Sequence, residues 1–310
     1  MAEVPAWLPP RWLPPVDAVT RADGTRVHAG CSYAIVPGYR PLQLDVIVPA
    51  ASAPAATVIW VHGGGYAMGD RRQVPDPARL AGFFDRITAA GFALVSLDYR
   101  LGREAVFPAA VHDVRAAIRW LARYGADLGL DTQRVAIWGE SAGAHLAGMA
   151  ATTLGDTGYE GELGIRSGAL ELRAFVSWYG AMDLPTIVRP SLTPELEAAF
   201  GGNVPEFVRF PPEYFNLGEE RWLDVDVRRE ASPLTHASAA MPPALFQHGD
   251  ADVMVPLQQS EVMVQRLREL GCDVELQVVP GAGHVWQNTD AATVDGVIER
   301  ALRFLGEQLA

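Results

Sequence analysis

The feature that most constrains the fold of this chain is a regular alternation of short apolar runs with longer amphipathic stretches. The runs have the length and the Val and Ile content of β-strands. They cover residues 44–48, 57–62, 92–98, 134–139, 174–179, 244–248 and 274–279. Runs this apolar are typical of parallel strands that are buried on both faces. We therefore expect an α/β fold with a mainly parallel central sheet flanked by helices.

Three of the intervening stretches carry apolar residues at helical spacing. These groups are Val111, Val114, Ile118 and Leu121; Met263, Leu267 and Leu270; and Val294, Ile298, Leu302, Leu305 and Leu309. Each pattern predicts a helix that covers the sheet. In folds of this kind the functional residues lie at the carboxyl ends of the strands.

The length of 310 residues, 49% of them hydrophobic, predicts one domain over residues 1–310 with an added cap. We expect the cap to come from about residues 1–30 and 184–230. The first segment has closely spaced prolines over residues 7–15, which rule out a regular helix there. The second segment breaks the strand and helix alternation. Its scattered aromatic side chains favour a packed cap over the alternative, a disordered loop.

Charge and composition exclude several kinds of function. The net charge of −12 disfavours nucleic acids and anionic membranes as partners. The sequence has no lysine, which excludes Schiff-base chemistry and a phosphate-binding lysine. Cys31 and Cys272 are too few for a disulfide framework or a cysteine metal site, and we expect neither metal nor cofactor. Without a signal-peptide pattern or a spanning apolar run, the chain is expected to be cytoplasmic, without stable membrane insertion.

The candidate nucleophile is Ser141, in the motif Gly-Glu-Ser-Ala-Gly at residues 139–143. An apolar strand-like run precedes the motif, and a helical stretch of small residues, 145–151, follows it. A nucleophile elbow needs this context, because a sharp turn between strand and helix projects the serine hydroxyl above the sheet. Glycines on both sides of the serine permit the close backbone packing that the turn requires.

A serine hydroxyl needs a base and an orienting carboxylate to attack an ester at neutral pH. In this fold the carboxylate residue follows the serine in the sequence, and the histidine follows the carboxylate residue. Asp252 lies in a loop just after the run 244–248, and His284 lies in a glycine-rich loop after the run 274–279. We therefore expect Ser141, His284 and Asp252 to form the catalytic triad.

Other residues compete for these roles. Asp250 is two residues from Asp252, and His248 and His145 are alternative bases. We expect His248 to end its strand as a packed residue, and His145 to point down the helix away from the serine. Two interpretations of Glu140 are open. In the first, its carboxylate has a functional role and either tunes the catalytic histidine or holds a water molecule. In the second, it is a buried acid that is hydrogen-bonded to nearby backbone.

Backbone N–H groups at glycines suit an oxyanion hole, because no side chain blocks the substrate. Residues 62–66 read His-Gly-Gly-Gly-Tyr and follow the strand-like run 57–62. We expect the N–H groups of Gly63, Gly64 and Ala142 to form the oxyanion hole.

Taken together, these motifs resemble the hormone-sensitive-lipase-like bacterial carboxylesterases of the α/β-hydrolase superfamily. Asp-Tyr-Arg-Leu at residues 98–101 and Phe-Pro-Ala-Ala at residues 107–110 are similar to a linking segment of that group. The loops of Asp252 and His284 also resemble those of acetyl and feruloyl esterases. The resemblance implies an α/β-hydrolase fold with a cap over an acyl pocket.

The predicted function is hydrolysis of short- to medium-chain carboxylic esters through an acyl-enzyme. The expected partner is a small-molecule ester. The sequence does not decide whether the chain forms a homodimer. The same triad could instead serve an amide, carbamate or lactone hydrolase or an elimination enzyme. A non-catalytic receptor on a hydrolase scaffold is the alternative from another class. Product analysis separates the enzymatic alternatives.

Overall fold

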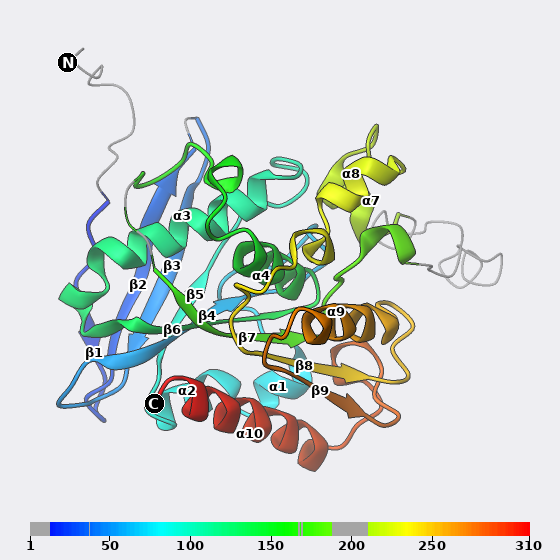
Figure 1. Ribbon diagram of the computed structural model, residues 1–310. Helices are drawn as coiled ribbons and strands as arrows, with labels where there is room; N and C mark the ends of the chain where they lie inside the picture. Colours follow the sequence, from blue (N-terminus) through cyan, green and yellow to red (C-terminus); the bar gives the residue numbers. More distant parts are fainter. Residues whose placement is uncertain (1–12, 37, 167, 169, 188–209) are drawn as a thin grey trace, which may run out of the picture.

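The computed structural model describes residues 13–36, 38–166, 168, 170–187 and 210–310. Within these residues one sheet has the strand order β1-β2-β3-β5-β4-β6-β7-β8-β9 (Figure 1). Its strands are β1 (Val19–Thr20), β2 (Arg26–Ile35), β3 (Pro41–Val48), β4 (Ala55–Val61), β5 (Ala93–Leu97), β6 (Leu130–Glu140), β7 (Leu172–Trp178), β8 (Ala244–Gly249) and β9 (Val274–Val279). From β5 to β9 neighbouring strands run parallel, which confirms the predicted sheet.

The first two strands were not expected, and they correct the predicted extent of the cap. Both β1 and β2 join the antiparallel edge of the sheet, with β2 paired to β3. A register shift between His28 and Cys31 interrupts the alternation that would mark β2 in the sequence. Of residues 1–30, those from 13 onward are described, and none of them lines the cavity described below. Residues 1–12 and 188–209 of the predicted cap lie outside the described residues.

Helices cover both faces of the sheet (Figure 1). One face carries α3 (Ala109–Tyr124), α4 (Ala142–Thr152) and α9 (Gln258–Glu269), and the other carries α1 (Asp76–Leu80), α2 (Phe83–Ala89) and α10 (Ala291–Gln308). The three predicted helices are confirmed as α3, α9 and α10. Two separate apolar cores result, one beneath each helical layer, and they fix the strand ends that carry the site.

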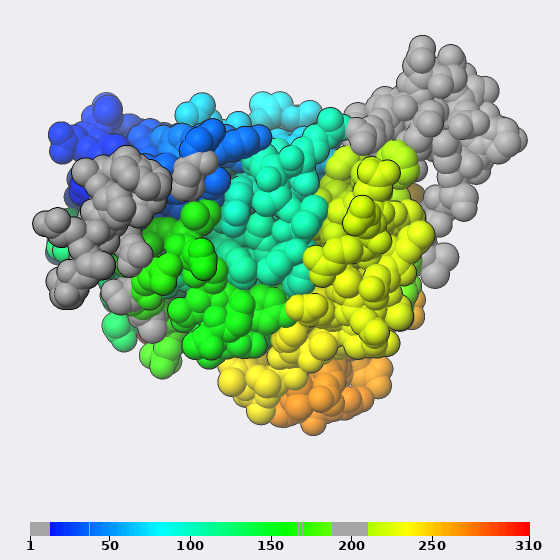
Figure 2. Space-filling model, turned by 90° about the horizontal axis from the view of Figure 1, so that it is seen from above, coloured from blue at the N-terminus to red at the C-terminus, as the bar shows by residue number. Residues whose placement is uncertain are grey.

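Part of the predicted cap region packs beside the sheet. It contains α7 (Pro212–Leu217) and α8 (Val225–Glu230). The N–H of Phe107 donates to the carbonyl of Asn216 at 2.6 Å, so α7 is tied to the segment that precedes α3. Figure 2 shows this region, in yellow-green, against the blue-green segment around residue 105.

A buried ion pair joins the end of β5 to α3. Asp113 is fully buried on α3, and the Arg100 guanidinium donates to both of its carboxylate oxygens at 2.8 Å. The backbone N–H of Arg100 adds a further bond at 2.8 Å. Burial raises the pKa of Asp113, although these bonds to Arg100 lower it in part. The pair fixes the first turns of α3 against the segment that follows β5.

We expect Arg100→Met to lower the free energy of unfolding at pH 7 by about 3–5 kcal/mol, because it strands a buried carboxylate. The deficit should shrink as the pH falls, since the folded state then protonates Asp113 at a higher pH than the unfolded state. Urea unfolding at pH 7 and pH 5 measures both effects. The double variant with Asp113→Leu removes the stranded charge and should regain most of the loss. A single variant as stable as the native chain would contradict this account.

Candidate active site

Ser141 lies on a sharp turn between β6 and α4. Its backbone has φ 53° and ψ −120°, a conformation that costs a non-glycine residue about 1–3 kcal/mol. A Cβ atom on Gly143 would collide with the carbonyl oxygens of Val61 and His62 at the end of β4. A Cβ atom on Gly139 would collide with the backbone of Gly143. Both glycines of the motif are therefore required by close packing, and the turn presents the serine at the carboxyl end of the sheet.

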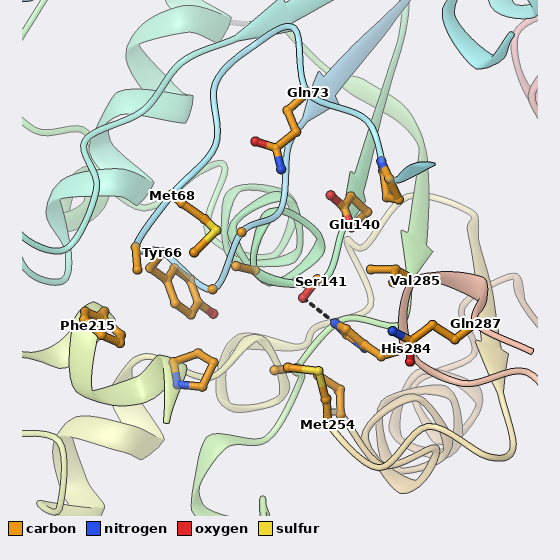
Figure 3. A pocket seen from close by; sticks show the side chains of 18 of the residues that line it. Tyr66, Met68, Gln73, Glu140, Ser141, Phe215, Met254, His284, Val285 and Gln287 are labelled. Carbon is orange, nitrogen blue, oxygen red and sulfur yellow. Dashed lines mark hydrogen bonds between the residues drawn. The ribbon is translucent and has the colours of Figure 1, made fainter. Parts of the chain in front are cut away.

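The structure brings the three predicted triad residues together. Ser141 Oγ lies 2.9 Å from His284 Nε2 (Figure 3), and His284 Nδ1 lies 2.7 Å from Asp252 Oδ2. The other Asp252 oxygen accepts the N–H groups of Met254 and Val255, both at 2.9 Å. With Nδ1–H donating to the carboxylate, Nε2 is the acceptor for the serine hydroxyl.

The environment of Asp252 favours the ionised form of its carboxylate. Burial works to raise its pKa, but hydrogen bonds from His248, His284 and the backbone N–H of Val255 together hold the pKa well below its usual range. An ionised carboxylate at this place stabilises the imidazolium that forms when His284 takes a proton.

The competing candidates occupy other positions. Asp250 accepts the N–H of Gly281 and does not contact His284. His248 is fully buried between the Ser260 hydroxyl and the Val255 carbonyl. His145 lies 2.6 Å from the carbonyl of Ala231, and burial lowers its pKa to about 4. The geometry therefore favours Asp252 and His284.

The expected oxyanion hole needs one correction. The N–H of Gly63 donates to the Glu140 carboxylate at 2.9 Å and is not available to a substrate. Gly64, Gly65 and Ala142 line the cavity, and within the described residues their N–H groups have no acceptor. The donor set that fits is therefore Gly64, Gly65 and Ala142. The glycine motif marks the loop in the sequence, but the direction of each N–H depends on the folded loop.

Buried contacts fix this loop. The Tyr99 ring stacks on His62, with 4.3 Å between ring centroids. Its hydroxyl contacts the carbonyl oxygens of His62 and Gly63 at 2.9 and 3.1 Å. Burial lowers the pKa of His62 to about 4, so this ring stays neutral at physiological pH. Gly64 has φ +104°, and a Cβ atom there would collide with the carbonyl of Met68.

Glu140 connects the loop to the triad. It is a buried acid bonded to nearby backbone, as one interpretation of the sequence held, and it also contacts the Tyr179 hydroxyl at 3.3 Å. The Tyr179 ring in turn packs edge-on against His284, with 4.9 Å between centroids. Burial raises the pKa of Glu140, and the proximity of His284 lowers it in part. Sequence reasoning missed Tyr179, whose only signal is its place at the end of a strand.

These residues open onto a cavity of about 570 Å³. Figure 3 shows Tyr66 and Phe215 on one side of Ser141 and Val285 and Gln287 on the other. Within the described residues, no group of three or more His, Cys, Asp or Glu side chains is placed to hold a metal ion. Among the same residues, no helix is long and apolar enough to cross a membrane.

Comparison with known proteins identifies the family. The family described as BD-FAE matches residues 44–267, a range that contains Ser141 and Asp252. The chain belongs to the BD-FAE family. Two relatives in Mycobacterium tuberculosis (strain ATCC 25618 / H37Rv) are esterase LipC, 30% identical over 82% of this chain, and esterase LipQ, 29% identical over 87%. The chain spans 59% and 60% of the length of these relatives.

Solved structures with the same architecture include two esterases. A truncated carbohydrate esterase from gut microbiota has a TM-score of 0.71 and 25% identity, covering 91% of this chain and 95% of its own. The thermophilic esterase Est2 from the Planctomycetes species Thermogutta terrifontis has a TM-score of 0.66 and 25% identity, covering 89% and 92%. With the sheet topology, these likenesses confirm the predicted α/β-hydrolase fold.

The role of Glu140 can be tested through the reactivity of Ser141. We expect Glu140→Leu to slow labelling by a fluorophosphonate about 10-fold or more, because Gly63 loses its acceptor and the oxyanion loop loses its anchor. Glu140→Gln keeps an acceptor oxygen for Gly63 and should label faster than the leucine variant. The measurement is the second-order labelling rate, with circular dichroism as the control for folding. Equal rates for the native chain and the leucine variant would show that the loop does not depend on Glu140.

Proposed function

We propose that this protein is a serine carboxylesterase. The observation that carries the proposal is the continuous hydrogen-bonded chain from Ser141 through His284 to Asp252, with distances of 2.9 and 2.7 Å. Ser141 lines a cavity together with Gly64, Gly65 and Ala142, whose backbone N–H groups have no acceptor among the residues that the structure describes. The family, and relatives whose names are esterases, support the same reaction.

The proposed mechanism follows from the geometry. Ser141 Oγ attacks the ester carbonyl carbon while His284 Nε2 takes the hydroxyl proton. The negative oxygen of the tetrahedral intermediate accepts hydrogen bonds from Gly64, Gly65 and Ala142. When the intermediate collapses, the bond to the alcohol oxygen breaks and His284 gives that oxygen its proton. A water molecule then attacks the acyl-enzyme in the same manner, and the carboxylic acid leaves.

The apolar side of the cavity suits a short- to medium-chain acyl group. It is lined by Tyr66, Met68, Pro212 and Phe215, and Phe215 is buried at its end. Apolar side chains favour a hydrocarbon chain, and the buried Phe215 ring restricts its length. One structure of Thermogutta terrifontis Est2 holds propionate, a short carboxylic acid, which is in keeping with this proposal.

A series of p-nitrophenyl esters from acetate to palmitate tests the proposal. We expect a maximum of kcat/KM at a short or medium chain, and a loss of at least about 10,000-fold in Ser141→Ala, because the nucleophile is gone. Ser52→Ala, on an exposed loop, is the matched control and should keep full activity. p-Nitroacetanilide, an amide of the same acetyl group, should not be turned over. Activity that survives in Ser141→Ala, or faster cleavage of the amide, would overturn the proposal.

The acyl side can be tested by enlarging it. We expect Phe215→Ala to raise the ratio of kcat/KM for the octanoate over the butyrate ester by about 10-fold, because a longer chain then fits. Phe210→Ala, in the same segment but outside the cavity lining, should leave the ratio unchanged. An unchanged ratio in Phe215→Ala would place the acyl chain elsewhere.

A further inference from the structure

Tyr179 follows β7 directly, at the carboxyl end of the sheet. Its backbone has φ 40°, in the left-handed region that a bulky residue seldom adopts. The N–H of Tyr179 donates to the carbonyl of Gln247 on β8 at 3.0 Å, so the neighbouring strand holds the residue in this conformation. Strained backbone of this kind clusters at active sites. The strain therefore indicates that the Tyr179 side chain has a function.

The Tyr179 ring supports the histidine of the triad. It is fully buried and packs edge-on against the His284 imidazole, with 4.9 Å between ring centroids and 63° between ring planes. Trp286, a buried residue of the same loop, packs edge-on against the Tyr179 ring at 4.9 Å. Edge-to-face contacts between buried rings are favourable and directional. The Tyr179 ring therefore helps to hold the imidazole in the orientation in which Nε2 faces Ser141.

The Tyr179 hydroxyl contacts the carboxylate that holds the oxyanion loop. It donates to Glu140 Oε2 at 3.3 Å, while Oε1 of the same carboxylate accepts the N–H of Gly63 at 2.9 Å. Burial, and then the nearby Glu140 charge, raise the pKa of the Tyr179 hydroxyl well above its usual range, so the hydroxyl stays a donor. A carboxylate is planar and rigid, so a bond that fixes one oxygen also fixes the direction of the other. Tyr179 thereby influences the position of Gly63.

The backbone beside Tyr179 also reaches the nucleophile. The carbonyl of Trp178, the last residue of β7, accepts the N–H of Ser141 at 2.9 Å. In the sheet, β7 lies between β6, which leads to Ser141, and β8, which leads to Asp252. Two consecutive residues at the end of β7 thus contact the nucleophile turn, the imidazole and the anchor of the oxyanion loop.

We propose that Tyr179 is a positioning residue that couples the general base to the oxyanion loop: its ring orients His284, and its hydroxyl orients Glu140, which holds Gly63. This inference rests on the proposed esterase function and adds a residue to its machinery. The physical basis is that a small displacement of the base or of the oxyanion donors slows the reaction strongly. Tyr179 does not line the cavity, so it acts on the rate constant of the reaction rather than on substrate binding.

A double-mutant cycle with Glu140 tests the role of the hydroxyl. We expect Tyr179→Phe, which keeps the ring, to lower kcat/KM for p-nitrophenyl acetate about 5-fold, through kcat and with KM unchanged. In the Glu140→Leu background the same substitution should change kcat/KM by less than about 2-fold, because the hydroxyl then has no carboxylate to orient. Tyr124→Phe is the matched control, because Tyr124 is buried on α3 and does not line the cavity. It should have no effect in either background.

The leaving group tests the role of the ring. p-Nitrophenolate leaves without a proton, whereas ethoxide needs one from His284. We expect Tyr179→Leu, which removes the ring, to raise the ratio of kcat/KM for p-nitrophenyl acetate over ethyl acetate by about 10-fold, because a poorly oriented imidazole delivers the proton less well. Tyr179→Phe should keep the native ratio. A smaller folded fraction lowers the rates of both esters equally, so the ratio is informative even when the leucine variant is unstable.

The outcomes separate this inference from the proposed function. If the native protein hydrolyses neither ester, the proposed function itself fails. If the native protein is active but Tyr179→Phe has no effect, or has the same effect with and without Glu140, the inference is wrong and the esterase proposal stands. A native ester ratio in Tyr179→Leu also overturns the inference. A hydroxyl effect that depends on Glu140, together with a changed ratio in the leucine variant alone, supports the coupling.

Discussion

The site depends on one close backbone contact, between the start of α4 and the end of β4. Gly143 lies directly against the carbonyl oxygens of Val61 and His62, where no Cβ atom would fit. This contact brings the nucleophile turn and the oxyanion loop to the same point of the sheet. The parallel pairing of β4 with β6 sets their relative height, with Val61 opposite Gly139. Without this contact, Ser141 and the N–H groups of the loop would not face one substrate atom.

Two buried carboxylates, Asp252 and Glu140, lie near His284, and their environments shift their pKa values in opposite directions. The hydrogen bonds that Asp252 accepts hold its pKa well below its usual range. Glu140 accepts fewer such bonds, and burial raises its pKa. Asp252 therefore supplies a fixed charge to His284, whereas Glu140 mainly anchors the loop through Gly63. Similar residue types thus take different roles because of their partners rather than their position in the sequence.

Much of this arrangement could be predicted from the sequence, because it depends on local patterns. Apolar runs and helical spacing located the strands from β3 to β9 and the helices α3, α9 and α10. The choice of Asp252 over Asp250 agrees with the geometry, because Asp252 contacts His284 Nδ1 whereas Asp250 accepts the N–H of Gly281. The antiparallel edge formed by β1 and β2 was missed, because its irregular register weakens the alternation on which a strand prediction depends.

The sequence by itself determined the parallel part of the sheet, the nucleophile turn and the residue types that surround it. Tertiary structure decided which N–H groups are free, since Gly63 is bound to Glu140 whereas Gly64 and Gly65 face the cavity. It also decided that Tyr179 packs against His284 and that Gln287 lines the same cavity as Tyr66, although these residues are far apart in the chain. The physical reason is that spacing along the chain controls local conformation, while the direction of a hydrogen bond and the wall of a cavity depend on contacts between distant segments.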